Sequence, residues 1–370
     1  MKVFGVGCLY FGYLEGKSPS TRDDFLRDIK ARLENVENVS SVTINTIYDE
    51  EHLPRALINK EGAEIEVPLA HGARLEFDIF LPFRIQESFY TKCDVETIHV
   101  DVIWEYDMPL AFVSYEWPDE EGDAAPSGLV VVLRKYLEKK LSTGNFKSGC
   151  IGPSPFHANF AIIETELNDG FKIDDVSADR LGYASMEIIA PRNSSVLQSV
   201  EAVRLNDALS KFYQLSELRS RAIREQTSIV ANSRALLEQE NPSTIQDKIK
   251  RIRRRPAEID ILNQNVFHEM LIRLDMSSAL SEAERYQLIS KNNPLSRFFE
   301  RYREMSIEQS WGKFSDVAKF FEERHQKAIG NVTAILAGII GGIVGSLIGS
   351  LATYALTSNS TIQPPPTAQK

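Results

Sequence analysis

The sequence predicts an α+β cytosolic head, with an antiparallel-rich sheet and two helices, followed by a long helical, coiled-coil-like stalk and a single C-terminal transmembrane helix. Three observations lead to this prediction. Period-two alternation of apolar residues is confined to residues 1–190, helical spacing follows residue 193, and residues 332–356 contain no charged side chain. The predicted segments are a head at 1–192, a stalk at 193–330, a membrane span at 331–356 and a disordered polar tail at 357–370.

The apolar segment reads VTAILAGIIGGIVGSLIGSLATYAL and its only polar side chains are hydroxyls. As a helix it would be roughly 37 Å long, enough to cross a hydrocarbon core of about 30 Å with some tilt. Each strongly apolar residue favours insertion by about 0.3–0.6 kcal/mol. The alternative is a buried core helix, but uncharged core helices are seldom this long. The segment therefore predicts a membrane span.

The charges on either side of the span predict its orientation. The segment before it contains Lys313, Lys319, Arg324 and Lys327, whereas Lys370 alone follows it. Because positive charge is retained on the cytoplasmic side, we expect a cytoplasmic head and a C-terminal tail on the opposite side. The protein would then be tail-anchored and single-pass.

Composition limits the class of protein. The chain of 370 residues is 43% hydrophobic and 25% charged, which is ordinary for a globular protein. Its net charge of −10 makes nucleic acid an unlikely partner, because a phosphate-binding surface needs excess positive charge. The three cysteines are Cys8, Cys93 and Cys150, and this odd, widely spaced set predicts reduced thiols rather than a disulfide framework.

The head should contain strands and two helices in a definite order. Apolar patterns predict strands at 3–14, 39–48, 75–81, 98–104 and 110–117, and further strands near 159–167, 171–176 and 184–190. Two helices interrupt them: one at about 25–36, capped by Ser20 or Thr21, and one at 127–141, capped by Ser127. Runs of strands interrupted by helices are typical of an α+β domain.

The stalk should be formed by long helices. Residues 194–240 lack Gly and Pro, and their apolar residues recur about every seven positions, which favours a helix packed against another helix. Helical spacing resumes at 259–274 and 280–289. A last helix starts after Pro294, and nothing beyond Pro294 prevents it from continuing into the span.

Small residues form two rows along the predicted span. Gly341, Gly345 and Gly349 make one row with a step of four residues, and the other contains Gly338, Gly342, Ser346 and Ser350. In lipid, close backbone approach along small residues is a main means of helix association. The rows therefore favour a homo-oligomeric span, which could line or gate a pore. Such a pore would be hydrophobic or poorly selective, and the alternative is that the glycines have no partner.

Two further segments are candidate binding sites. The basic run contains Lys248, Lys250, Arg251, Arg253, Arg254 and Arg255, which would suit lipid headgroups or another anionic ligand. The alternative is a solvated helix end. The Gly/Pro-rich segment 149–159 could hold a ligand through His157 and Asn159, or could simply be a rigid connection.

No enzyme signature is present in the sequence. Gly5, Gly7 and Gly12 have the wrong spacing for a dinucleotide fingerprint. A phosphate loop, a His-Glu-x-x-His motif, a Gly-x-Ser-x-Gly motif and a cysteine pair at metal spacing are all missing. We therefore expect a non-enzymatic protein without cofactor or metal.

The order of an α/β cytosolic domain, a long helix and a membrane span resembles that of CorA-type magnesium channels. This sequence departs from that pattern because it has one span rather than two and no Gly-Met-Asn after it. Ion selectivity therefore does not carry over. The sequence favours a membrane-anchored sensor or effector that self-associates through its span. The alternatives are a CorA-like channel or transporter architecture, a passive membrane tether for an interaction domain, and a membrane-tethered enzyme.

Overall fold

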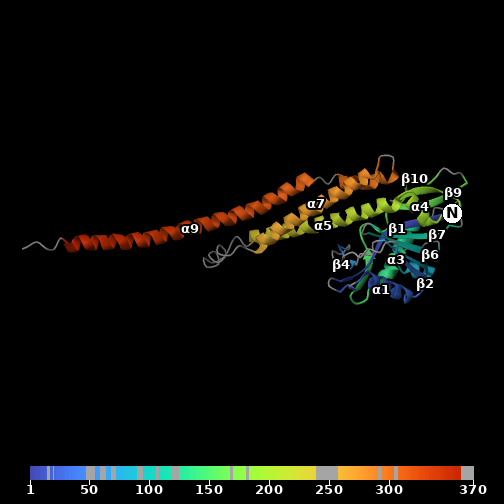
Figure 1. Cartoon of the computed structure of the whole chain (residues 1–370), viewed down its shortest axis with the longest axis horizontal. Coiled ribbons are helices and arrows are strands. Elements are labelled where there is room, and N and C mark those ends of the chain that lie inside the picture. The colour runs from blue at the N-terminus through green and yellow to red at the C-terminus, as the bar shows by residue number, and fades with distance from the viewer. Residues whose placement is uncertain are drawn as a thin grey trace, which may run out of the picture. The chain divides into compact units, whose positions relative to one another are not determined.

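The computed structural model describes residues 1–14, 17–19, 21–46, 55–58, 64–67, 72–89, 95–105, 108–117, 125–166, 170–180, 183–238, 257–290, 293–303 and 307–359 (Figure 1). The chain forms two compact units. One comprises Met1–Glu225 with Glu269–Ile307, and the other comprises Gln226–His268 with Glu308–Lys370. The boundary that the sequence suggests at residue 192 therefore lies inside the first unit.

The first unit is built on a mixed sheet with the strand order β10-β11-β9-β1-β7-β6-β5-β2, to which β3, β4 and β8 add. The strands are β1 (Lys2–Leu14), β2 (Val39–Thr46), β3 (Arg55–Ile58), β4 (Glu64–Val67), β5 (Ala73–Phe80), β6 (Thr97–Glu105), β7 (Met108–Glu116), β8 (Phe146–Cys150), β9 (Ala158–Thr165), β10 (Lys172–Arg180) and β11 (Tyr183–Pro191). The described pairings are antiparallel except that of β9 with β11. The sequence thus predicted the antiparallel-rich character correctly.

Helices α1 (Arg22–Glu34) and α3 (Pro126–Leu141) pack on one face of this sheet. The face is apolar because alternate residues of the strands, such as Phe77 and Val100, point into the core. Helix α3 begins directly over Gly5, where an added Cβ would lie 2.7 Å from the Pro126 carbonyl oxygen. Ser127 was expected to cap α3, but the helix already begins at Pro126.

Among the described residues, helices cover only part of the opposite face. Aromatic rings join β1 and β9 to the helices above them: Phe4 stacks on Phe160 at 4.9 Å, and Phe156 meets Phe212 of α5 (Leu205–Glu238) at 5.0 Å. Phe212 also lies 5.8 Å from Phe299 of the 3₁₀ helix η1 (Pro294–Phe299). The part of this face formed by β5, β6 and β7 carries charged side chains instead, as described in the next section.

The helical half of the chain differs in detail from the sequence prediction. Instead of one helix from residue 194, α4 (Val196–Ala202) ends before α5 begins, because Arg204 adopts a left-handed φ of 55°. One helix, α7 (Ala257–Arg285), replaces the two that were expected. After Pro294 the chain forms η1 and α8 (Glu300–Arg303), and a short helix, α2 (Phe83–Glu87), was not predicted.

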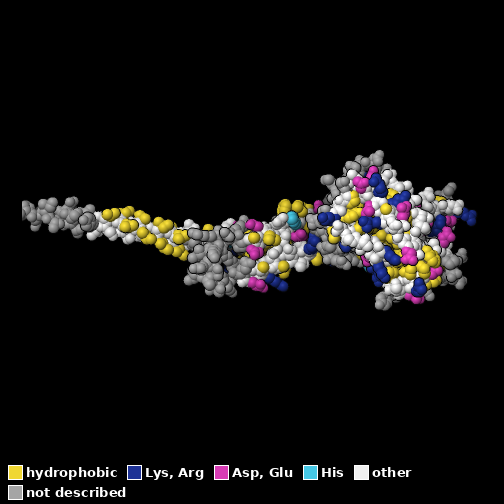
Figure 2. Space-filling view, turned by 90° about the horizontal axis from the view of Figure 1, so that it is seen from below, with side chains coloured by type: hydrophobic (Ala, Val, Ile, Leu, Met, Phe, Trp, Pro, Cys, Tyr) yellow, Lys and Arg dark blue, Asp and Glu magenta, His cyan; other side chains and the backbone are white. Residues whose placement is uncertain are grey.

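In the second unit, the end of α5, the start of α7 and α9 (Ile307–Asn359) share a small apolar cluster. Ile229 and Leu236 of α5, seven residues apart, are buried there with Phe321 of α9. Helix α9 then continues without interruption, and its segment Lys313–Thr353 is long and apolar enough to cross a membrane. Figure 2 shows apolar side chains along the surface of this segment.

Candidate functional site

The uncovered part of the sheet face presents charged residues on two neighbouring strands. Period two places Arg74, Glu76 and Asp78 of β5 on the side opposite the core, and His99 and Asp101 of β6 share that side. The antiparallel register pairs Asp78 with His99 and Glu76 with Asp101. Asp78 and His99 are opposite charges directly across the two strands and attract each other, whereas Glu76 and Asp101 are like charges. Arg74, two residues before Glu76 on β5, lies against both of these carboxylates and offsets their repulsion.

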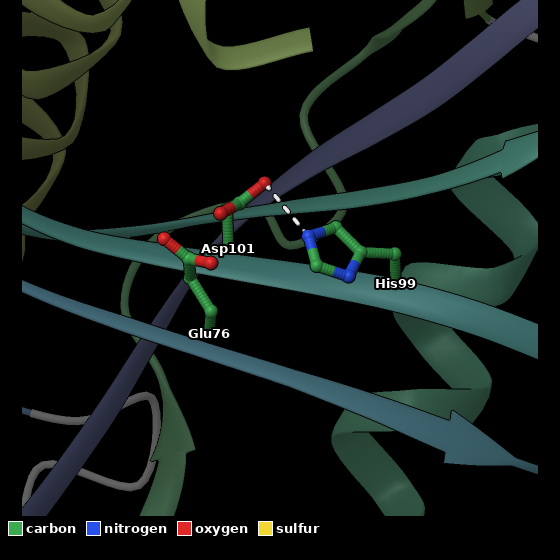
Figure 3. A group of neighbouring side chains, drawn as sticks. All are labelled: Glu76, His99 and Asp101. Carbon is green, nitrogen blue, oxygen red and sulfur yellow. Dashed lines mark ion pairs between the residues drawn. The ribbon is translucent and has the colours of Figure 1, made fainter. Parts of the chain in front are cut away.

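These five residues form a continuous chain of alternating charges, which we call the ion-pair ladder. Figure 3 shows three of its members, Glu76, His99 and Asp101. Arg74 lies 2.7 Å from a Glu76 oxygen through Nε and 2.9 Å from Asp101 Oδ1 through Nη2. His99 Nδ1 lies 2.8 Å from Asp78 Oδ1, and His99 Nε2 lies 3.4 Å from Asp101 Oδ2. Only 4% of the Asp101 side chain is exposed. Asp101 is thus a buried carboxylate held by two cationic groups.

The ladder shifts the pKa values of its two central groups in opposite directions. The hydrogen bond to Asp101 is the main cause that raises the pKa of His99 to about 9; burial opposes it and Asp78 adds to it. Burial favours a higher pKa for Asp101, but the hydrogen bonds from His99 and Arg74 outweigh this and hold it below its ordinary value. Both groups are therefore charged at neutral pH.

The raised pKa of His99 predicts that the head loses stability at alkaline pH. An unfolded histidine has a pKa of roughly 6.5, so the folded state binds this proton more tightly. The stabilisation of the folded head by protonated His99 is complete below pH 6.5 and is lost as the pH rises through about 9. Because the His99 ring is 43% exposed, we expect it to contribute only about 1 kcal/mol to the free energy of unfolding. Urea unfolding of the full chain at pH 6 and pH 9.5 should show this loss, and a His99→Gln variant that shows the same loss would contradict it.

The ladder also contains donor atoms that could surround a metal ion. One atom each from Glu76, His99 and Asp101 lies within 4.8 Å of the others. However, the Arg74 guanidinium already lies against both carboxylates, and His99 carries a proton on the nitrogen that would bind the metal. We therefore interpret the cluster as a set of ion pairs that neutralise one another.

A cavity of about 820 Å³ opens over the ladder, within the first compact unit. We call it the head cavity. Its lining combines ladder residues, other polar groups and an apolar wall: Arg74, Asp78, His99 and Asp101; Lys2, Glu96, Thr97, Ser114, Glu116 and Ser195; and Phe80, Phe83, Val95, Ile98, Tyr115, Val196 and Leu197. Volumes of about 300–1,000 Å³ are typical of small-molecule sites. The cavity is therefore the best candidate site for a ligand.

The small residues predicted to mediate association lie on an open helix surface. A Cβ added at Gly338, Gly341, Gly342, Gly345 or Gly349 would meet no atom within 4 Å. The neighbouring hydroxyls are satisfied inside the helix, since Ser346 Oγ donates to the Ile343 carbonyl at 2.9 Å and Ser350 Oγ to that of Ser346 at 2.7 Å. The two rows of small residues therefore form a smooth helix surface, and the hydroxyls of Ser346 and Ser350 need no polar partner from another helix. Association along it stays a prediction.

The other predicted site residues lie away from the head cavity or outside the described residues. Asn159 Oδ1 accepts a hydrogen bond from the Ser127 amide at 3.1 Å, so Asn159 helps to satisfy the first turn of α3. His157 is exposed, and its ring lies 5.9 Å from that of Tyr183. Ligand contact by either residue stays a prediction. The basic run of Lys248, Lys250, Arg251, Arg253, Arg254 and Arg255 lies outside the described residues.

The segment 149–159, which we expected to be a loop, begins as a strand. Gly149 and Cys150 belong to β8, and the irregular part starts at Ile151. Cys8 and Cys150 are buried free thiols, in agreement with reduced cysteines, whereas Cys93 lies outside the described residues. Burial raises the pKa of the Cys8 thiol well above its ordinary value, which makes that thiol unreactive.

Sequence reasoning did not identify the ladder. It followed the apolar alternation of β5 and β6 but ignored the intervening positions, which carry Arg74, Glu76 and Asp78 on one strand and His99 and Asp101 on the next. Charges at every second position of two neighbouring strands were the available signal. Their pairing required the register. No protein-family model, curated protein or solved structure matches the chain, so its function is inferred from its own geometry.

Proposed function

We propose that this protein is a membrane-anchored sensor or effector. Its cytoplasmic head binds a small ligand in the head cavity, and its C-terminal helix anchors the chain and self-associates in the membrane. The observation that carries the proposal is the head cavity itself, a volume of about 820 Å³ that is lined by residues of the ion-pair ladder. Clefts with a few convergent polar groups among apolar walls are the usual form of ligand sites.

The continuity of α9 supports a link between the cytoplasmic part and the membrane. The same helix contains Ala318 and Phe321, which are packed in the apolar cluster with α5 and α7, and the exposed apolar residues from Ile335 to Leu351. A helix transmits displacement along its axis because each turn is held by backbone hydrogen bonds. A movement at Phe321 would therefore reach the start of the span without an intervening hinge.

Self-association is supported by exposed apolar side chains and by the small-residue rows. On α5, Ile223, Val230 and Leu237 recur every seven residues, and 51%, 43% and 49% of their surfaces are exposed. A repeat of seven is the spacing by which helices pack against one another in coiled coils. In the span, the glycine rows allow two helices to approach closely. Both features suit a second copy of the chain.

We expect Gly341, Gly345 and Gly349, when changed together to Leu, to convert the oligomer into a monomer. Three bulky side chains would hold the helix backbones apart and remove the packing that drives association in lipid. The measurement is the mass of the purified chain in detergent. The matched control adds comparable bulk on the other side of the helix by changing Leu336, Ile340 and Leu347 to Phe, and it should leave the mass unchanged.

The same variants distinguish a sensor from a passive tether. A passive tether requires only an apolar helix. The triple leucine variant of a passive tether would therefore keep the oligomeric state of the wild-type chain in detergent and its activity in cells. If the wild-type chain and both variants have one and the same mass, the span does not assemble the protein. If instead the wild-type chain is an oligomer and the triple leucine variant is a monomer, leakage from liposomes that contain the wild-type chain would test whether the span conducts.

A further inference from the structure

The cationic groups of the head cavity are already occupied by the protein itself. Lys2 Nζ donates to the Ser194 carbonyl oxygen at 3.1 Å and lies 3.7 Å from Glu164 Oε1, which is outside the cavity lining. Arg74 and His99 are held between carboxylates in the ion-pair ladder. A ligand would therefore find no unpaired positive group among the described residues that line the cavity.

Two carboxylates of the lining have no such counter-ion. One Glu96 oxygen accepts a hydrogen bond from the Phe83 amide at 2.7 Å, but within the described part of the chain neither Glu96 nor Glu116 has a cationic partner. Glu96 directly precedes β6 and Glu116 ends β7. Since these strands are antiparallel, both carboxylates lie at the same end of the strand pair. The register of β1 with β7 also places Lys2 opposite Glu116, but the ammonium group of Lys2 lies against Ser194 and Glu164. Two carboxylates and one cation leave this end of the cavity with a net negative charge.

The charge of the whole lining has the same sign. With His99 neutral its formal charge is −2, because two cations (Lys2 and Arg74) face four carboxylates (Asp78, Glu96, Asp101 and Glu116). With His99 protonated the charge remains negative. Charge complementarity therefore favours a cationic ligand over an anionic one.

The same end of the cavity has apolar walls. Phe80, which ends β5, is 45% exposed and presents an aromatic ring to the cavity. Phe83, Val95, Val196 and Leu197 add apolar surface. An aromatic ring beside carboxylates suits an ammonium group, which is attracted by both the carboxylate charge and the ring face. The apolar surface suits a hydrocarbon body.

We propose that the head cavity binds a small organic ammonium compound with an apolar body. Its ammonium group lies at Glu96 and Glu116, and its apolar body lies against Phe80 and Leu197. This inference rests on the proposed function, because it names the class of ligand for the same cavity. It assigns Glu96, Glu116 and Phe80 as the residues that determine specificity.

The test compares three probes of similar shape on the full chain in lipid nanodiscs, with empty nanodiscs as the blank for membrane partitioning. Isothermal titration would be carried out with phenethylammonium chloride, with neutral phenethyl alcohol and with anionic phenylacetate. We expect the ammonium probe to bind about tenfold more tightly than the alcohol, and phenylacetate to bind most weakly.

Variants assign the effect to residues. Glu116→Gln and Glu96→Gln should each weaken binding of the ammonium probe by about fivefold and leave the affinity for the alcohol unchanged. Phe80→Ala should weaken the binding of both probes. Glu166→Gln removes a carboxylate that is 82% exposed and outside the cavity lining. This control should leave the affinities for the ammonium probe and the alcohol unchanged. Thermal unfolding of each variant shows whether the fold is retained.

The outcomes separate this inference from the proposed function. Tighter binding of phenylacetate, or equal binding of ammonium and alcohol, overturns the organic ammonium ligand but keeps a ligand-binding head. Absence of binding by all three probes also overturns the inference. In that case the mass of the same preparation still reports whether the span assembles the chain.

Discussion

Replacement of Arg74 by Met should reduce the free energy of unfolding by about 3 kcal/mol. Asp101 is a carboxylate with 4% of its side chain exposed, and Arg74 supplies two hydrogen bonds to its Oδ1 atom. Removal of one member of a buried pair typically costs about 3–5 kcal/mol, because the remaining charge is poorly compensated. Asp101 would keep only its second partner, His99, at 3.4 Å. The lower end of this range applies because 29% of the Arg74 side chain is exposed. Loss of the guanidinium should also raise the pKa of Asp101.

Urea unfolding of the full chain, followed by the fluorescence of Trp104 and Trp117, would measure this effect. A matched control is Arg27→Met, because Arg27 forms an ion pair with Asp24 and 76% of its side chain is exposed. That pair should contribute less than about 1 kcal/mol. Addition of Asp101→Asn to Arg74→Met should restore part of the stability, because the buried charge is then gone. Equal effects of Arg74→Met and Arg27→Met would show that the ladder is only a solvated surface network.

Replacement of Gly5 by Ala should destabilise the head by about 3 kcal/mol. An alanine Cβ would lie 2.7 Å from the Pro126 carbonyl oxygen and 2.9 Å from the Ser127 amide nitrogen. Both are backbone atoms of the first turn of α3, so the helix itself must move. Overpacking of a core typically costs about 1–3 kcal/mol, and backbone clashes lie at the upper end.

Two other glycines provide a graded comparison. At Gly7 an added Cβ would meet Ser154 Oγ at 2.5 Å and Val130 Cγ1 at 2.7 Å, which are side-chain atoms and not backbone atoms, so Gly7→Ala should cost less than Gly5→Ala. At Gly338 the Cβ would meet nothing within 4 Å, and alanine is a better helix former. Thermal unfolding should therefore rank the three variants in this order. A Gly5→Ala protein as stable as Gly338→Ala would contradict the close approach of α3 to β1.

Local sequence patterns predicted much of the fold because each reflects a local physical preference. The apolar run of β1, the alternation along β5 and β6, the Thr21 cap of α1 and the uncharged apolar segment of α9 all require only neighbouring residues. Features that depend on distant partners were missed. The parallel pairing of β9 with β11 and the break at Arg204 both depend on tertiary packing, which sequence periodicity does not contain.

The candidate site could not be predicted for the same reason. Asp101 was one of several carboxylates in the sequence, and its partner Arg74 is 27 residues away. Only the register of β5 against β6 brings the two together and places them on the face opposite α3. The Gly/Pro-rich segment 149–159 suggested a ligand contact at Asn159, and this stays a prediction. The sequence did not reveal that the Asn159 side chain accepts a hydrogen bond from the start of α3.

The most direct test of the proposed function is the mass of the purified full-length chain in detergent, measured beside a chain that ends at Gly330. The truncation keeps the head, α5, α7 and the start of α9, but it lacks the apolar residues from Ile335 to Leu351. We predict that the full-length chain forms one defined oligomer and that the truncated chain does not. If both chains have the same oligomeric state, the span does not assemble the protein and serves only as an anchor.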